Sequence, residues 1–299
     1  MRILLLGKIG QVGYELQRTL APLGDVIAVD QDVANFLKPD SIRKLIRAQA
    51  PNVIVNAAAY TAVDKAETDK SLCHTLNAAA PSLLAEEARA QNALLVHYST
   101  DYVYPGDKTS PYAEDDATGP LGEYGRSKLD GDLAIQQSGA NYLIFRTAWV
   151  YGARGQNFLR TMLRLAKERP ELRIVSDQIG APTWSRMIAQ GTALAIAKAV
   201  HAPTRHSGVY HLTAAGETSW YEFTKAIFEE FAPERRPMLT PITSDHYPTP
   251  AKRPAYSVLS NDKFERVFGA RLPNWRLQLS LVAADMASQN TPAAVSESK

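Results

Sequence analysis

Short apolar runs alternate with helical patterns through the first half of the chain, and this alternation limits the fold more than any other feature. The runs begin at Arg2, Asp25, Asn52, Ala93 and Tyr142 and read RILLLG, DVIAVD, NVIVNAAA, ALLVHYST and YLIFRTAWVYG. Helical patterns separate them, for example over residues 41–49, 81–90 and 127–137. Almost wholly apolar strands are buried on both faces, as in a parallel sheet covered by its crossover helices. The pattern predicts an α/β fold, a Rossmann-type doubly wound parallel sheet.

The alternation loosens after about residue 155, which indicates a second unit. A helix over 158–167, the strand LRIVSD, a helix over 185–199, the strand GVYHLTA and a terminal helix over about 277–287 are predicted there. We assign residues 1–152 plus about 183–215 to a dinucleotide-binding domain. A smaller, interleaved C-terminal substrate-binding lobe takes about 153–182 plus 216–287, over the sheet edge where such folds bind ligands. The small, polar segment 288–299 is predicted to be a mobile tail.

The composition favours a small-molecule partner. The chain has 33 Lys and Arg against 31 Asp and Glu in 299 residues, with no long basic run, so nothing in the charge indicates nucleic acid or a membrane surface. Its single cysteine, Cys73, cannot form an internal disulfide, and the first apolar run is too short for a signal peptide or membrane span. We expect a cytoplasmic protein, with a homodimer as one candidate for its oligomeric state.

A glycine-rich turn, Gly7-Lys8-Ile9-Gly10-Gln11-Val12-Gly13, follows the first strand and opens a helical pattern. Glycines there let the backbone approach a pyrophosphate, which the free N–H groups of the helix start can bind. Asp30 ends the second strand, where a carboxylate accepts from the adenosine ribose and disfavours a 2'-phosphate. Lys8 and Arg2 could offset that charge, so NADH and NADPH both stay open. The structural alternative for the glycines is a tight turn that binds no ligand. The structural alternative for Asp30 is a turn residue that only ends the strand.

Two tyrosine–lysine pairs have the same spacing, Tyr124 with Lys128 and Tyr221 with Lys225. On any helix such residues are neighbours on one face, so the spacing does not distinguish them. Reduction of a ketone needs a hydride donor, a proton donor and a group that holds the carbonyl oxygen. A tyrosine can donate the proton, and a lysine one turn away eases its loss.

The surroundings of the two pairs differ. The strand ALLVHYST brings Ser99, Thr100 and Asp101 to the carboxyl edge of the sheet, where a hydroxyl could bind the substrate carbonyl. The second pair lies among Trp220, Phe223 and other apolar residues at the helical spacing of a packed face. The sequence therefore predicts that the first pair is catalytic and the second structural.

Eight blocks of sequence carry a resemblance to known enzymes: GKIGQVGYELQ, NAAAYTAVDKAE, HYSTDYVYPG, YGRSKLDGD, FRTAWVYG, NFLRTMLRLAKE, DQIGAPT and TPAKRPAYSVLS. The chain resembles the extended short-chain dehydrogenase/reductases from residue 1 to about 287, and within them the dTDP-4-dehydrorhamnose reductase family. The resemblance implies reduction of the C4 keto group of dTDP-4-dehydro-L-rhamnose by NADPH or NADH. It implies a catalytic trio of Thr100, Tyr124 and Lys128. It also implies a pyrophosphate turn made by Gly7, Gly10, Gln11, Val12 and Gly13.

Further residues are implied beside the cofactor. Asn35 and Phe36 stand where relatives have an Asp-Phe pair near the adenine. Ala57, Ala58 and Ala59 are small enough for the dinucleotide to pass over the strand end, although tight helix–sheet packing would also explain them.

The resemblance places Thr61 and Val63 beside the sugar, although Thr61 and Asp64 also fit a helix capping box. Trp149 resembles a wall of the sugar pocket, with burial in the core as the alternative. Asp101 follows the catalytic threonine at the strand end and is also a candidate for substrate binding.

Two residues are candidates for the substrate diphosphate. Asn157 begins a predicted helix, so it is either an N-cap or part of a phosphate site. Arg253 can bind phosphate in bidentate fashion, or it is a surface residue next to Pro254.

Some relatives hold a metal through carboxylates. Glu15 matches one ligand position, but Arg186 stands at another, where its charge would oppose a cation. No metal is therefore predicted.

Two other functions are weighed. A nucleotide-sugar dehydratase has an Asp-Glu pair after the catalytic threonine, whereas Tyr102 follows Asp101 here and leaves the elimination without an obvious base. A regulatory subunit that binds NADP without turnover would not need the intact trio.

Overall fold

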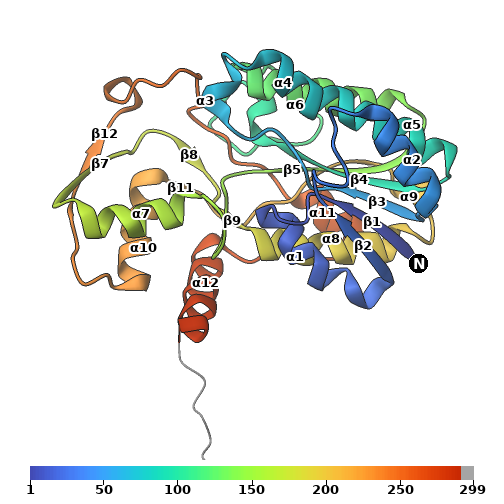
Figure 1. The fold of residues 1–299 in the computed structure, drawn as a ribbon. Helices are drawn as coiled ribbons and strands as arrows, with labels where there is room; N and C mark the ends of the chain where they lie inside the picture. The colour runs from blue at the N-terminus through green and yellow to red at the C-terminus, as the bar shows by residue number, and fades with distance from the viewer. Residues whose placement is uncertain (291–299) are drawn as a thin grey trace, which may run out of the picture.

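A computed structural model describes residues 1–290 and shows a parallel sheet of six strands in the order β10-β5-β4-β3-β1-β2 (Figure 1). The strands are β1 (Arg2–Leu6), β2 (Asp25–Val29), β3 (Val53–Asn56), β4 (Leu94–Thr100), β5 (Asn141–Thr147) and β10 (Gly208–His211). Every neighbouring pair runs parallel. Because β2 lies on one side of β1 and β3 on the other, the direction of winding reverses at β1, and the predicted doubly wound sheet is confirmed. Ligands of such sheets bind outside the carboxyl ends of the strands at this switch point.

Helices cover both faces of the sheet. Ile3 and Leu5 of β1 point into a core formed with α1 (Gln11–Thr19), α8 (Ser185–Ala199) and α11 (Asp262–Phe268). Leu4 and Leu6 point the other way, into a core formed with α2 (Pro39–Gln49), α5 (Ala80–Ala90) and α6 (Glu123–Gln137). Successive residues of a strand face opposite sides, which is why these strands read as continuous apolar runs.

The lobe lies beyond the carboxyl ends of the strands (Figure 1). It contains α7 (Phe158–Glu168), β7 (Glu171–Val175), α10 (Trp220–Phe231), β12 (Met238–Ile242) and α12 (Trp275–Asn290), with β7 and β12 paired in parallel. Phe223 and Ile227 of α10 pack with Leu159 of α7 and Leu279 of α12 in a separate core. Two further ladders are separate two-stranded sheets: β6 (Val150–Tyr151) with β9 (Thr183–Trp184), and β8 (Ile179–Gly180) with β11 (Thr218–Ser219).

Three short helices complete the connections, α3 (Val63–Ala66), α4 (Lys70–His74) and α9 (Pro203–His206). Within residues 1–290, no helix is both long and apolar enough to cross a membrane.

Some elements differ from the sequence predictions. Helix α6 starts at Glu123, four residues earlier than predicted, and therefore includes Tyr124. Helix α11 lies in the segment assigned to the lobe, yet its Phe264 and Phe268 pack into the core of the sheet. Helix α12 continues to Asn290, so residues 288–290 of the predicted tail are helical, and the rest of that tail lies outside the described residues.

Candidate active site

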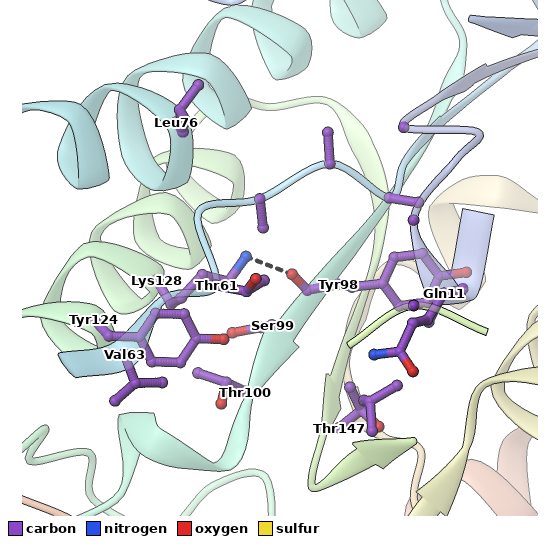
Figure 2. A pocket seen from close by; sticks show the side chains of 18 of the residues that line it. Gln11, Thr61, Val63, Leu76, Tyr98, Ser99, Thr100, Tyr124, Lys128 and Thr147 are labelled. Atoms are coloured by element: carbon purple, nitrogen blue, oxygen red, sulfur yellow. Dashed lines mark hydrogen bonds between the residues drawn. The ribbon is translucent and has the colours of Figure 1, made fainter. Parts of the chain in front are cut away.

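A cleft of about 1040 Å³ opens where the carboxyl ends of the strands meet the lobe. Its sheet side is formed by the glycine turn after β1 and by the ends of β3, β4 and β5, and its lobe side includes Phe158 and Trp220. Figure 2 shows Tyr124 and Lys128 reaching into it from α6, close to Thr100 at the end of β4. The fold thus brings the predicted cofactor turn and the predicted catalytic trio to one cavity.

The glycine turn packs so closely that side chains are excluded at two positions. Gly7 has φ +87°, and a Cβ there would lie 2.8 Å from the nitrogen of Ala58. A Cβ on Gly13 would lie 1.9 Å from the carbonyl oxygen of Gly7. Gly10 stands at the N-cap of α1, so the first N–H groups of that helix point toward the cleft. This geometry is suited to an anion at the start of α1.

The residues after β2 close the same end of the cleft. The Asp30 carboxylate accepts from the N–H groups of Ile9 at 3.0 Å and Gln31 at 2.8 Å, which ties the end of β2 to the glycine turn. Asn35 accepts from the N–H of Leu37 at 2.9 Å, and Phe36 packs against the neighbouring core. All of these side chains line the cleft, as do Ala57, Ala58 and Ala59 after β3.

Tyr124 and Lys128 lie one turn apart on α6. The phenol of Tyr124 points toward the end of β4 (Figure 2), and its burial raises its pKa, an effect opposed by its hydrogen bond with Thr100. Lys128 is buried and donates from Nζ to the carbonyl oxygen of Tyr98 at 2.5 Å. Burial lowers the pKa of Lys128 to about 8. Lys128 is therefore removed from bulk water, whereas Tyr124 is half-buried, and both side chains line the cleft.

Thr100 is held from two directions. The Thr100 hydroxyl donates to Oδ1 of Asp101 at 3.0 Å. The Oγ1 atom of Thr100 also accepts from the N–H of Tyr102 at 3.2 Å. Burial raises the pKa of Asp101 to about 6. The structure thus shows Asp101 orienting Thr100, a contact that the sequence did not predict.

The second tyrosine–lysine pair has different surroundings. Tyr221 packs against the lobe core, and Lys225 donates to the Glu222 carboxylate at 3.0 Å on the same helix. These are the contacts of an ordinary surface turn of helix.

Two tryptophans stack in the cleft. The rings of Trp149 and Trp220 lie parallel, with centroids 3.4 Å apart. Trp149 has φ +47°, and its ring crosses Gly180 so closely that a Cβ there would lie 2.4 Å from it. The sequence predicts a packed face for Trp220, and its ring does pack against the lobe core beside Phe158. Trp220 also lines the cleft, which the sequence did not predict.

Among the substrate candidates, Thr61 and Val63 line the cleft. Helix α3 begins at Val63 with Ala62 at its N-cap, so the capping box of Thr61 with Asp64 does not form. Asp64 instead binds Arg253 through both oxygens, at 3.1 and 2.8 Å. The Arg253 guanidinium is thus already occupied by a carboxylate.

Asn157 is the N-cap of α7, as one interpretation of the sequence predicted. Its Oδ1 accepts from the N–H of Arg160 at 3.1 Å. Its Nδ2 donates to Oε1 of Gln11 at 3.0 Å and to the carbonyl oxygen of Gly152 at 2.9 Å. This amide therefore joins the lobe to the glycine turn.

Arg186 lies between two carboxylates, at the position where some relatives hold a metal ion. It donates to Glu15 at 3.0 Å and to both oxygens of Asp285 at 3.0 and 3.1 Å. Among residues 1–290, no group of three or more His, Cys, Asp or Glu side chains is arranged to hold a metal ion. The guanidinium provides the positive charge between these two carboxylates.

The doubly wound sheet, the glycine turn and a tyrosine–lysine helix facing one cleft define an oxidoreductase of the short-chain dehydrogenase/reductase class. The family described as RmlD substrate binding domain matches residues 1–288. A dTDP-4-dehydrorhamnose reductase of Burkholderia thailandensis is 49% identical, covering 97% of this chain and 100% of that protein. One of Escherichia coli K12 is 46% identical, with 93% and 95% covered.

The solved structures with a similar fold include members of the same enzyme family. A dTDP-4-dehydrorhamnose reductase from Bacillus anthracis in complex with NADP has a TM-score of 0.87 at 33% identity, and covers 95% of this chain and 99% of its own. The chain belongs to the dTDP-4-dehydrorhamnose reductase family.

Replacing Tyr124 by Phe should lower turnover roughly 10²- to 10⁴-fold, the usual contribution of one acid–base group, because only the proton donor is removed. Cofactor binding should be retained. Steady-state rates and a fluorescence titration with NADPH measure both. Tyr221→Phe is the matched control and should keep wild-type rates; an equal loss there would mean that the wrong pair was chosen.

Treatment with EDTA, and later addition of Mg²⁺, should leave turnover and the mass in solution unchanged, because the Arg186 guanidinium already binds Glu15 and Asp285 where a cation would lie. Activity assays and light scattering would test this. Loss of activity with EDTA and its recovery with Mg²⁺ would contradict the prediction.

Proposed function

We propose that this protein reduces the C4 keto group of dTDP-4-dehydro-L-rhamnose to dTDP-L-rhamnose with hydride from NADPH or NADH. The observation that carries the proposal is the convergence of Thr100, Tyr124 and Lys128 on the cleft that the glycine turn closes. The relatives are named for this reaction and cover nearly the whole chain.

A nicotinamide cofactor would supply the hydride, and the residues present fit it. The turn at Gly7 and Gly13 has no room for a Cβ and presents the start of α1 to a pyrophosphate. Gly10, Gln11 and Val12 complete this turn. Asp30 would bind the adenosine ribose, Asn35 and Phe36 the adenine, and the alanines after β3 would let the dinucleotide pass.

The chain's own groups provide the proton transfer. Tyr124 donates its phenolic proton to the carbonyl oxygen as that oxygen gains negative charge. Thr100 forms a hydrogen bond with the phenol, and its hydroxyl hydrogen, which Asp101 accepts in the free protein, would turn to the carbonyl oxygen of the bound substrate. Lys128 stabilises the phenolate that remains, and its donors reach the nicotinamide ribose hydroxyls.

The substrate would lie between the sheet and the lobe. Trp149 and Trp220 form one wall, with Thr61 and Val63 opposite to contact the sugar. Asn157 and Arg253 are proposed for the diphosphate, which would compete with Asp64 for the Arg253 guanidinium. The two-unit division, the homodimer and the cytoplasmic location stay predictions.

The test is oxidation of NADH and of NADPH by the purified protein with dTDP-4-dehydro-L-rhamnose. We expect substrate-dependent oxidation of at least one cofactor, with dTDP-L-rhamnose as the product. Cofactor binding without turnover would overturn the proposal in favour of a regulatory subunit. Release of water from a dTDP-hexose would favour a dehydratase.

A further inference from the structure

A buried polar chain runs behind Lys128, away from the cleft. Nζ of Lys128 lies 3.1 Å from Nε2 of His97, and Nδ1 of His97 lies 3.1 Å from Nδ2 of Asn56. Each of these three residues is only 1% exposed. The proton transfer described above uses neither His97 nor Asn56.

The orientation of the Asn56 amide is set by the backbone. Its Oδ1 accepts from the N–H of Ala58 at 3.2 Å, so Nδ2 is the atom that faces His97. An amide nitrogen only donates, which makes Nδ1 of His97 an acceptor. Burial, the largest influence, holds the pKa of His97 well below its usual range, so the ring is neutral. A neutral ring that accepts at Nδ1 has its hydrogen on Nε2.

This hydrogen points at Lys128. An ammonium group has three donors and no acceptor, so a charged Lys128 would set two N–H groups against each other across 3.1 Å. A neutral amine has a lone pair that accepts from His97, while its own N–H donates to Tyr98 as Figure 2 shows. The surroundings of Nζ therefore match the amine.

We propose that His97, oriented by Asn56, is a positioning residue that stabilises the uncharged amine of Lys128 and couples cofactor binding to uptake of one proton. The inference rests on the proposed function. A bound dinucleotide brings negative phosphates and ribose hydroxyls that accept from nitrogen, and both favour the ammonium. The amine lone pair then forms an N–H bond with a proton from solvent, and the ammonium donates to the ribose.

The other groups around Lys128 change the equilibrium between its amine and its ammonium form less than burial does. Asp132 on α6 favours the ammonium, but its carboxylate is shared with Arg146 at 3.2 Å and Ser99 at 2.8 Å. Burial raises the pKa of the Cys73 thiol on α4 and of the Tyr124 phenol, which keeps both groups uncharged. Burial thus remains the largest influence and lowers the pKa of Lys128 to about 8.

The first test is a fluorescence titration of the full chain with NADPH between pH 7 and 9, with NADH as a cofactor lacking the 2'-phosphate. The Kd for both should rise about tenfold from pH 7 to 9, since affinity falls tenfold per unit above the pKa of the lysine in the free protein. Calorimetry in two buffers of different ionisation enthalpy should show uptake approaching one proton at pH 9. Binding that is independent of pH, without proton uptake, would overturn the inference while leaving the proposed function intact.

The variant Asn56→Asp tests the part played by His97. A carboxylate keeps the bond from Ala58 but accepts from His97, so the ring hydrogen moves to Nδ1 and Nε2 becomes an acceptor for the ammonium. The rise in Kd between pH 7 and 9 should shrink to about twofold, as a one-unit increase in the lysine pKa requires. An unchanged rise would contradict the inference.

A buried carboxylate also favours the ammonium by its charge alone, so a control is needed. In a His97→Phe background, Asn56→Asp should change the pH dependence much less than it does with His97 present, and an equal change would show that His97 carries none of the effect. If Asn56→Asp fails to fold, as judged by circular dichroism, His97→Gln replaces it. The side-chain carbonyl of the introduced glutamine can accept from the ammonium, so the same reduced rise is expected, and a wild-type rise would overturn the inference.

Discussion

Burial of the parallel sheet on both faces determines where this protein can place polar chemistry. Leu4, Leu5 and their neighbours leave no room for an exposed face, and an unpaired polar group in such a layer would cost free energy. Polar side chains therefore gather where the strands end. Thr100 ends β4 and Asp101 follows it, and Asp30 follows β2. The cleft at this edge is a consequence of the way the sheet is covered.

The same burial sets the chemistry of the tyrosine–lysine pair. Because α6 packs against the sheet, Lys128 lines the cleft as a buried side chain and its pKa falls to about 8, whereas the pKa of Tyr124 rises. A charged lysine near the phenol favours the phenolate, so the two opposed shifts make the protonation of Lys128 important for the acid strength of Tyr124.

The sequence predicted the sheet well, because each of its first five strands contains a run of at least three apolar residues whose burial follows from composition. The neighbouring residues in the sequence also distinguished one tyrosine–lysine pair from the other. The structure places Tyr124 beside Thr100 and Tyr221 in the lobe. Contacts between distant residues were not predictable in this way. Asp64 and Arg253 meet only through tertiary packing, and so do Trp149 and Trp220, which stack in the cleft. Helix α11 was not recognised, since its seven residues are too few to show a strong period.

The central claim is that hydride passes from the nicotinamide ring to C4 of a keto sugar while Tyr124 supplies the proton. The most direct measurement uses NADPH with deuterium at the transferable C4 position and dTDP-4-dehydro-L-rhamnose, followed by mass spectrometry and NMR of the product. The account predicts one deuterium at C4 of dTDP-L-rhamnose. Product without deuterium at C4, or with deuterium at another carbon, would contradict it.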